Sequence, residues 1–556
     1  MKTNYIIFIL LSILIIIGST LLLGPNKQER LKRAEEKKAA ELALSPIPTP
    51  NLATPLGAAP ITTPAFPAEN SSSRLITVKT PLFTGVIDTL GARIVKLSLN
   101  QFKASTKKDS PLVDVLHDTP GAPSTRLFLD GIKIPNPIPF SYAGADVVEV
   151  RNGKAELSFK WKSNDGILIK KTYVIDPKSY MVEHSFEVEN GTNSRITELV
   201  TVEWSAKMIH HGKRSEYNRQ FIALVSDKVD RVRKKPKEKK TFSGTISWFG
   251  FSDKYFMAAF LPEVGGDTSI VLAALNDNSL VGAQFSYPQD SIPAGQSSLK
   301  VSKLYLGPMK LDLLTPLGDG LNKAINYGWI GFLAKPTLSL LKFLNRWLEN
   351  YGIAIIVITL LLRVLFLPLT IKSMESMKEM QNKMQLLKPK IDELKEKFKS
   401  DKTQQNQELM KLYSAHGVNP LSSLGGCLPM LIQVPVFIAL YEVLLYSIEL
   451  RHSTFLWINN LAEPEHLFNI PGIGVPFRIL PLIMGVSWYA SQKLTPTSAP
   501  TSDNMQMKIM EYMPIIFTVM FWGLPSGLIL YWTVSNILSI AQQLYVNHRI
   551  AKKGRA

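Results

Sequence analysis

The chain has 556 residues, of which 46% are hydrophobic, and it carries a formal net charge of +18. The length gives room for two or more domains, and the basic residues flank apolar segments, which argues against a protein that binds a specific nucleic-acid sequence. The single cysteine, Cys427, excludes an intramolecular disulfide, so any exported domain must be stabilised by its own core.

The first apolar segment, residues 5–23, is long enough to enter a bilayer. Because no small-x-small cleavage site follows Leu23, we interpret residues 1–23 as an N-terminal membrane anchor rather than a cleaved signal peptide. Residues 24–73 are predicted to be a flexible linker, since residues 42–73 are rich in Pro, Ala, Thr, Ser and Asn and lack a periodic apolar pattern.

Residues 74–318 contain short segments in which apolar and polar side chains alternate, which is typical of strands. Turn-forming pairs stand between such segments at Asn152-Gly153, Asp165-Gly166 and Asn190-Gly191, and each pair predicts a hairpin. We therefore expect a large exported antiparallel β-sandwich domain over residues 74–318, with residues 231–240 as a charged surface loop.

Residues 319–351 are predicted to contain an amphipathic helix that lies in the membrane interface. Within this range, residues 329–348 place apolar side chains at helical spacing, with Lys342 and Arg346 on the other face. An ordinary helix that packs between domains has the same pattern and remains an alternative.

Residues 352–548 are predicted to form the membrane core, a polytopic α-helical bundle. The N-terminal anchor brings the total to about six spans, because the core itself offers candidate spans at residues 352–371, 427–446, 477–492, 509–524 and 526–546. Residues 371–426 contain ten lysines, and the tail 549–556 has four basic residues and no acidic one, so both should be cytoplasmic. An even number of spans then places the N-terminus in the cytoplasm too, although the basic residues between 27 and 38 favour the opposite orientation.

Residues 372–426 are predicted to form a cytoplasmic helical hairpin, punctuated at Pro389 and near Asp401, with hinges near residues 372–373 and 425–426. Methionine side chains adapt to variable apolar partners, so the apolar stripe on the first arm could receive substrate, or it could pack against the second arm. The stripe recurs every three or four residues and consists of Met374, Met377, Met380, Met384, Leu387, Ile391, Leu394 and Phe398.

Arg363 lies near the middle of the span 352–371, where a charge is costly unless it meets water or a polar partner. Thr359 precedes it by one helical turn, and Gln433 lies at a similar depth in the next candidate span. The last span has an unusual polar load, and each of its polar residues alone is typical of interhelical hydrogen bonding. Together with Arg363, these residues predict a hydrated groove open to the cytoplasm. The polar residues of the last span are Ser526, Tyr531, Trp532, Ser535, Asn536 and Gln542.

The sequence lacks the constellations that perform chemistry. P-loop, HExxH and GxSxG motifs are absent, the eight histidines are scattered, and no second intramembrane carboxylate accompanies Arg363. We therefore expect no catalytic residue, no metal and no cofactor, and a protein that is not an enzyme.

Several segments resemble the YidC membrane-protein insertase family of Gram-negative bacteria. The resemblance is specific in residues 327–370, 419–440, 479–494 and 513–543, and weaker in the exported residues 91–97 and 248–262. It implies six spans, a periplasmic β-sandwich after the first, an interfacial helix, a cytoplasmic helical hairpin, and a groove open to cytoplasm and lipid.

The same resemblance assigns roles to individual residues. It implies that Arg363 is the characteristic arginine of the groove, that Thr359 and Tyr531 contact substrate, and that Gln433 lines the groove. Trp532 departs from the second tyrosine of some relatives, and residues 422–424 look inserted before the third span.

The function implied by the resemblance is that of a membrane protein insertase and chaperone, which inserts and helps fold newly made inner-membrane proteins without hydrolysing nucleotides. The implied partners are nascent membrane proteins, the Sec translocon, the ribosome and membrane lipids, and the implied location is the bacterial inner membrane. Two other classes remain open. A small-solute transporter usually has repeated halves, which we do not find, and an envelope glycan- or lipid-binding protein would use the β domain.

Overall fold

The computed structural model describes residues 73–208, 218–275, 280–399, 401–416, 428–471, 474–494 and 505–553. The predicted anchor, nearly all of the predicted linker, Cys427 and the expected hinge at residues 425–426 lie outside the described residues.

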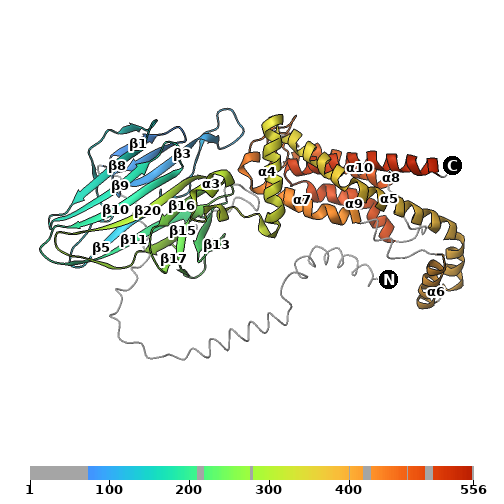
Figure 1. The fold of residues 1–556 in the computed structure, drawn as a ribbon, viewed down its shortest axis with the longest axis horizontal. Helices are drawn as coiled ribbons and strands as arrows, with labels where there is room; N and C mark the ends of the chain where they lie inside the picture. Colours follow the sequence, from blue (N-terminus) through green and yellow to red (C-terminus); the bar gives the residue numbers. More distant parts are fainter. Residues whose placement is uncertain are drawn as a thin grey trace, which may run out of the picture. The chain divides into compact units, whose positions relative to one another are not determined.

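Residues 75–308 form three β-sheets, so the prediction of a mainly β region is confirmed (Figure 1). The largest sheet has nine strands, in the order β13 (Lys228–Val232), β12 (Gln220–Val225), β15 (Ile246–Ser252), β16 (Phe256–Pro262), β20 (Ser297–Pro308), β10 (Met181–Asn190), β9 (Ile167–Ile175), β8 (Ala155–Lys162) and β6 (Ser141–Tyr142). The second has six strands, in the order β14 (Lys240–Gly244), β17 (Thr268–Ala274), β18 (Leu280–Ser286), β11 (Ile196–Lys207) and β19 (Asp290–Ile292), with β5 (Ser124–Leu129) also paired to β11. The third has five strands, in the order β4 (Leu112–Asp114), β3 (Arg93–Lys103), β2 (Phe83–Asp88), β1 (Leu75–Lys79) and β7 (Val147–Glu149).

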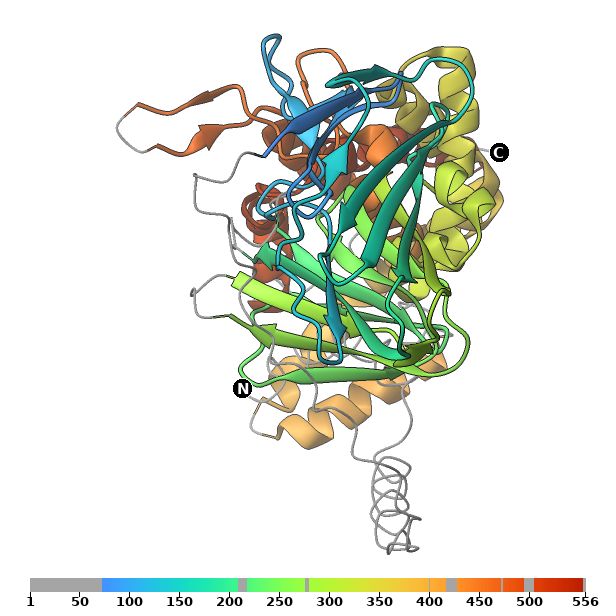
Figure 2. The ribbon, with the colours of Figure 1, turned by 90° about the vertical axis from the view of Figure 1, so that its left-hand side faces the viewer.

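The strands of the nine-stranded and six-stranded sheets lie in layers (Figure 2), and aromatic side chains pack between the two sheets. The ring of Phe285 on β18 lies 5.8 Å from Phe249 on β15 and 6.4 Å from Phe260 on β16. Trp204 on β11 lies 5.7 Å from Phe251 on β15. All seven residues of β16 are buried, which its uninterrupted apolar sequence allows. The two sheets therefore share one hydrophobic core.

One of the three predicted hairpin turns forms and two do not. Asp165-Gly166 joins β8 to β9, which pair in antiparallel register. Asn152-Gly153 was expected to pair the strands on either side, but Val148 pairs instead with Val78 of β1, in a parallel arrangement that also departs from the all-antiparallel prediction. These long-range pairings override the local turn preference.

Asn190-Gly191 is the second hairpin prediction that is wrong, because it leads from the nine-stranded to the six-stranded sheet. The side-chain amide of Asn190 donates to the carbonyl oxygens of Ser194 and Ile292, at 2.8 and 2.9 Å. The turn is therefore fixed by contacts with β19 rather than by a partner strand across it.

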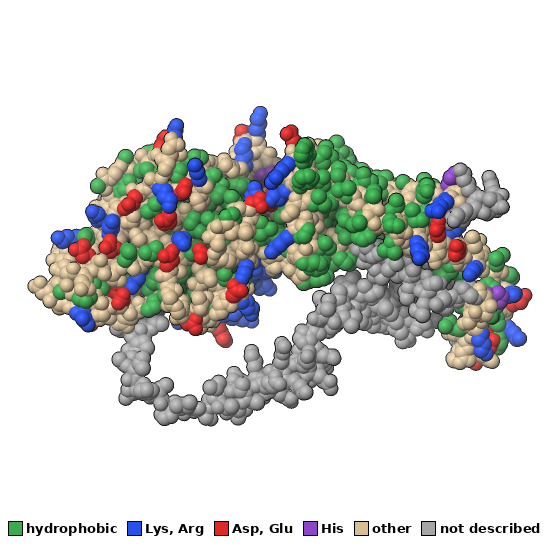
Figure 3. Space-filling model, viewed as in Figure 1, with side chains coloured by type: hydrophobic (Ala, Val, Ile, Leu, Met, Phe, Trp, Pro, Cys, Tyr) green, Lys and Arg blue, Asp and Glu red, His purple; other side chains and the backbone are tan. Residues whose placement is uncertain are grey.

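Short helices connect the β region to the helical region. They are α3 (Leu311–Leu317), η1 (Leu321–Ala324) and η2 (Gly328–Ile330), and they lead into α4 (Gly331–Leu348). The helix expected at residues 329–348 thus begins two residues later, and it packs against α5 and α7. Its outer face exposes Phe332 and Trp347, at 71% and 77%. Figure 3 shows apolar side chains gathered over this part of the molecule.

Helix α5 (Tyr351–Lys397) runs without a break from the predicted span into the predicted hairpin and then turns back into α6 (Lys402–Ala415) (Figure 1). The hinge expected at residues 372–373 therefore lies inside a continuous helix, which also passes Pro368 and Pro389. The two arms pack on each other: Met380, Leu387 and Ile391 of α5 are buried against α6, beside Leu409, Leu412 and Tyr413.

The remaining helices are α7 (Leu428–Tyr446), η4 (Ile448–Leu450), α8 (Leu480–Leu494), α9 (Met505–Phe521) and α10 (Ser526–Lys553), with a small hairpin of β21 (Phe468–Asn469) and β22 (Pro476–Phe477) before α8. Within the described residues, α5 is the one helix whose length and apolar composition suffice to cross a bilayer. Shorter apolar helical stretches cover Gln433–Tyr446 and Tyr512–Phe521.

Candidate functional site

Arg363 lies on α5 and reaches across to α10. Its Nη2 atom donates to the carbonyl oxygen and to the hydroxyl of Ser535, both at 2.8 Å, and to the hydroxyl of Ser539 at 2.5 Å. Its Nε atom is buried and has no hydrogen-bond partner among the described residues. Within the described ranges, no carboxylate forms an ion pair with this guanidinium, so its charge is held by neutral groups.

Gln433 brings a third helix, α7, to the same point. Its side-chain nitrogen donates to the hydroxyl of Tyr531 at 2.9 Å and to the hydroxyl of Ser535 at 2.7 Å. The hydroxyl of Ser535 is therefore contacted by both Arg363 and Gln433, and it joins α5, α7 and α10. The similar depth predicted for Arg363 and Gln433 agrees with this shared contact.

A small cavity of about 30 Å³ opens at this junction. This volume has room for about two water molecules, and its polar walls offer them partners. A polypeptide segment is far larger than this volume, so the cavity as it stands does not hold one. The lining consists of Thr359, Leu362, Arg363, Phe366 and Thr370 from α5, Gln433 and Val436 from α7, and Tyr531 and Ser535 from α10.

Five of the seven predicted groove residues line this cavity, namely Thr359, Arg363, Gln433, Tyr531 and Ser535. Thr359, Tyr531 and Ser535 are buried, and the hydroxyl of Thr359 donates to the carbonyl of Ile355 one turn earlier, at 2.6 Å. The hydroxyl of Thr359 is thus already engaged within its own helix.

Trp532 and Asn536 are not brought to the cavity, because they lie on the neighbouring face of α10. The ring of Trp532 packs 4.9 Å from Phe437, 5.0 Å from Phe521 and 5.6 Å from Trp488. The amide of Asn536 donates to the hydroxyl of Ser487 on α8 at 3.2 Å. One residue advances an α-helix by about 100°, so Tyr531 and Trp532 cannot share a face.

Sequence reasoning missed Thr370 and Ser539, which extend the polar contact between α5 and α10. Gln542 donates to Thr370 at 2.6 Å, and Arg549 pairs with Glu375 at 3.5 Å. The helical spacing of the sequence could have identified both residues. Ser539 follows Ser535 by one turn and Thr370 follows Arg363 by two, so each lies on the face of a residue already identified.

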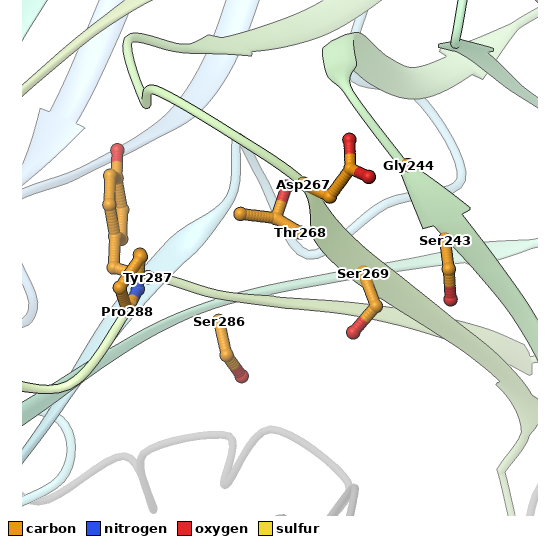
Figure 4. Close-up of a pocket in the computed structure, with 8 residues that line it drawn as sticks. All are labelled: Ser243, Gly244, Asp267, Thr268, Ser269, Ser286, Tyr287 and Pro288. Atoms are coloured by element: carbon orange, nitrogen blue, oxygen red, sulfur yellow. The ribbon is translucent and has the colours of Figure 1, made fainter.

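A second hollow, of about 550 Å³, lies on the β region where β14 and β17 meet the end of β18 (Figure 4). The hydroxyls of Ser243, Ser269 and Ser286 point the same way, whereas Asp267 and the ring of Tyr287 point the other way. Asp267 accepts a hydrogen bond from Thr245 at 3.0 Å. Across the described residues, no group of three or more His, Cys, Asp or Glu could hold a metal ion.

Two family models match the chain and together cover nearly all of its described part. The model of the YidC periplasmic domain matches residues 75–340, and the model of the 60Kd inner membrane protein matches residues 343–553.

Close relatives match over almost their whole length. A protein from Geobacter metallireducens named membrane protein insertase YidC is 35% identical over 565 residues, which cover 99% of both chains. A protein of the same name from Pelobacter propionicus is also 35% identical, over 98% of this chain and 99% of the relative. A solved structure described as an active YidC insertase with the first transmembrane domain resolved has 20% identity and a TM-score of 0.35, and covers 85% of this chain and 92% of that one.

Proposed function

Since this chain belongs to the YidC membrane protein insertase family, we propose that the polar junction of α5, α7 and α10 is where it receives its substrates. As a member of the family, the protein is a bacterial inner-membrane protein with a periplasmic β domain, and it inserts membrane proteins. The family is not an enzyme family. The relatives favour this function over the transporter and the glycan- or lipid-binding alternatives.

The observation that carries the proposal is the uncompensated charge of Arg363. A guanidinium held only by hydroxyl and carbonyl groups keeps a positive field, and this field is strong where water is scarce. An acidic tail of a nascent membrane protein is therefore attracted toward the cavity, where the polar side chains of the lining provide a first polar environment within the apolar layer.

The apolar part of the substrate follows a different surface. Helix α5 exposes Leu360, Leu361, Val364 and Leu365 around Arg363. A substrate helix can lie along these side chains while its tail meets the arginine, and then pass into lipid. Each CH₂ group that leaves water contributes about 0.8 kcal/mol, which supplies the driving force without nucleotide hydrolysis.

The proposal also places the remaining segments in the membrane, in the cytoplasm or in the periplasm. The chain has six spans, both termini are cytoplasmic, and residues 24–73 link the anchor 1–23 to the periplasmic domain at residues 74–318. Residues 319–351 lie in the outer interface, the hairpin 372–426 is cytoplasmic, and residues 352–548 form the membrane core. The ten lysines of residues 371–426 and the basic tail 549–556 support this orientation. Nascent chains arrive from the ribosome directly or beside the Sec translocon.

Trp532 and Asn536 have a supporting role in this proposal rather than a place at the substrate. Their contacts with α7, α8 and α9 fix the rotation of α10, which in turn aims Tyr531 and Ser535 at Arg363.

Crosslinking from neighbouring positions of α10 tests the proposal. A photoreactive para-benzoylphenylalanine replaces Tyr531 in one variant and Trp532 in another, and ribosome-bound chains of a small membrane protein are presented to each. The proposal expects crosslinks from position 531 and few from position 532. Equal crosslinking from both positions, or crosslinking from 532 alone, would place the substrate elsewhere.

A further inference from the structure

The loop between β13 and β14 is the most basic exposed segment of the β region. We refer to residues 231–240 as the basic loop. It contains seven basic residues against one acidic residue, Glu238, which gives it a net charge of +6. Within the described part of the chain, none of its exposed cations forms an ion pair with a carboxylate. These exposed cations are Arg233, Lys234, Lys235, Lys237, Lys239 and Lys240.

The basic loop is fastened at its start, so its charges have a defined position. Val232 and Pro236 are buried. The Nη2 atom of Arg231 donates to the carbonyl oxygen of Ala324 in η1 at 2.6 Å. The neighbouring Lys323 pairs with Asp227 in the turn before β13. The first contact ties the loop, and the second ties the turn before β13, to the short segment that leads from the β region into α4.

That segment reaches the outer end of the helical bundle within a few residues. The hydroxyl of Tyr327 lies 3.3 Å from the hydroxyl of Ser447, directly after the end of α7. Trp329 and Phe332 follow, and both are exposed. Exposed aromatic side chains of this kind mark the level at which lipid headgroups meet acyl chains. In Figure 3, Lys and Arg side chains gather beside the apolar surface, near the position of β13.

We propose that the basic loop binds the headgroups of anionic phospholipids on the periplasmic face of the membrane. The charged side chains of the loop are exposed, and its lysines act as point charges that suit a sheet of phosphates. Attraction between its charge and an anionic surface acts over about 10 Å at ordinary ionic strength, and the contacts of Arg231 and Tyr327 hold the loop near that surface. An exported basic segment is compatible with the membrane topology, because long domains are translocated largely regardless of their charge.

The loop would thereby set the position of the β region on the membrane. Arg451, in the segment after α7, donates to the carbonyl oxygens of Lys103 and Ala104 at 2.7 and 3.2 Å, which gives a second link between the β region and the bundle. Anionic lipid bound by the basic loop adds a third attachment of the β region, at the loop between β13 and β14.

The inference rests on the proposed membrane position of α4. The test measures the position of α4 and the contact between the basic loop and lipid headgroups separately. The full chain, with Cys427→Ser and a fluorophore on Lys237→Cys, is reconstituted into vesicles of phosphatidylcholine alone or of phosphatidylcholine with phosphatidylglycerol. A fixed fraction of lipid carries a nitroxide quencher on its headgroup. A second protein carries the fluorophore on Trp347→Cys, in vesicles with the nitroxide on the acyl chain.

The matched variants differ only in where four charges are removed. One is changed in the basic loop, at Arg233→Gln, Lys234→Gln, Lys235→Gln and Lys239→Gln. The other is changed at the opposite end of the strands, at Lys133→Gln, Lys160→Gln, Lys162→Gln and Arg195→Gln. Ser297, which pairs with Glu189 at that end, is eleven residues along β20 from Pro308, or about 35 Å at the rise of a strand.

The inference expects phosphatidylglycerol to raise the quenching at position 237 by about twofold, and high salt to abolish the increase. The distal variant should behave like the parent, and the loop variant should lose the response. Quenching that is equal in both kinds of vesicle would overturn the inference. A loop variant that retains the quenching response would also overturn the inference. So would a loop variant that keeps this response and loses only the insertion of acidic-tailed substrates, because that result would assign the loop to substrate binding. Absence of acyl-chain quenching at position 347 would refute the position of α4 and the inference with it.

Discussion

Arg363 and Ser535 are joined twice, because one nitrogen of the guanidinium donates both to the hydroxyl and to the backbone carbonyl oxygen of the serine, each at 2.8 Å. The second of these bonds uses a carbonyl that would ordinarily serve the helix alone. The arginine is thus bound to the backbone of α10 as well as to a side chain, which fixes its position along that helix.

The first prediction concerns the charge of Arg363. Arg363→Ala should lower the insertion of substrates with acidic exported tails by about tenfold, since it removes an attraction of about 1–2 kcal/mol. Arg363→Lys should retain most activity, because the field depends on charge more than on the planar fork. Insertion into vesicles at matched protein levels provides the measurement, and a substrate with a neutral tail provides the control. An equal loss for both kinds of tail would indicate a structural role.

The second prediction tests the close packing of the three helices that build the site. A Cβ atom on Gly527 of α10 would lie 2.8 Å from the side chain of Leu444 and 3.1 Å from the carbonyl oxygen of Leu461. Gly527→Ala should therefore destabilise the bundle by about 1–3 kcal/mol.

The measurement for Gly527 is thermal unfolding in detergent, and Gly265→Ala is the control, because that position has no neighbour within 4 Å. A melting temperature of Gly527→Ala equal to that of the control would mean that α10 does not approach α7 this closely.

Some residues of the site could be predicted from the sequence, and the arrangement of others could not. Arg363 and Gln433 were predictable because a polar residue within an apolar span must meet water or another polar group, and Thr359 was predictable because it lies one helical turn before Arg363. The arrangement of the polar residues on α10 was less predictable from the sequence. Composition identifies its polar residues, but the rotation of the helix, which separates Tyr531 from Trp532, is fixed by the aromatic contacts with Phe437 and Phe521.

The strand pairing of the β region could likewise be predicted only in part. Asp165-Gly166 forms its hairpin because β8 and β9 are neighbours in both sequence and space. Val147–Glu149 has a similar turn after it, yet it joins β1, a strand about seventy residues earlier. Turn chemistry describes only local preferences, whereas strand order depends on which edge is free when the core forms.

The third prediction concerns a buried lysine of the β region. Lys171 on β9 is fully buried, and its amine donates to the carbonyl oxygen of Gly91 at 3.1 Å. Burial, together with a smaller effect of the nearby charge of Arg93, lowers the pKa of Lys171 to about 7. Between pH 7 and the ordinary pKa near 10.5, the unfolded chain therefore binds more protons at this site than the folded chain. Stability should rise with pH across this window.

Hydrogen exchange of the β9 amides in the full chain measures this effect. Protection should increase from pH 7 to pH 9 after correction for the intrinsic exchange rate, and Lys171→Met should remove the dependence. The matched control is Lys162→Met, at an exposed position of β8. Identical slopes for the parent and Lys171→Met would show that the amine keeps its proton when buried.

In the proposed function the charge of Arg363 recognises the charge of the substrate tail, and an exchange of charge at this position separates that role from a structural one. Insertion is measured for Arg363 and Arg363→Glu, each with a substrate whose exported tail is acidic or basic, and Arg363→Gln reports the effect of losing the arginine without adding a charge. If the charge of Arg363 attracts the tail, Arg363→Glu should insert the acidic-tailed substrate less well than Arg363→Gln does, and the basic-tailed substrate better. If Arg363→Glu and Arg363→Gln insert both substrates equally, the arginine does not act through its charge.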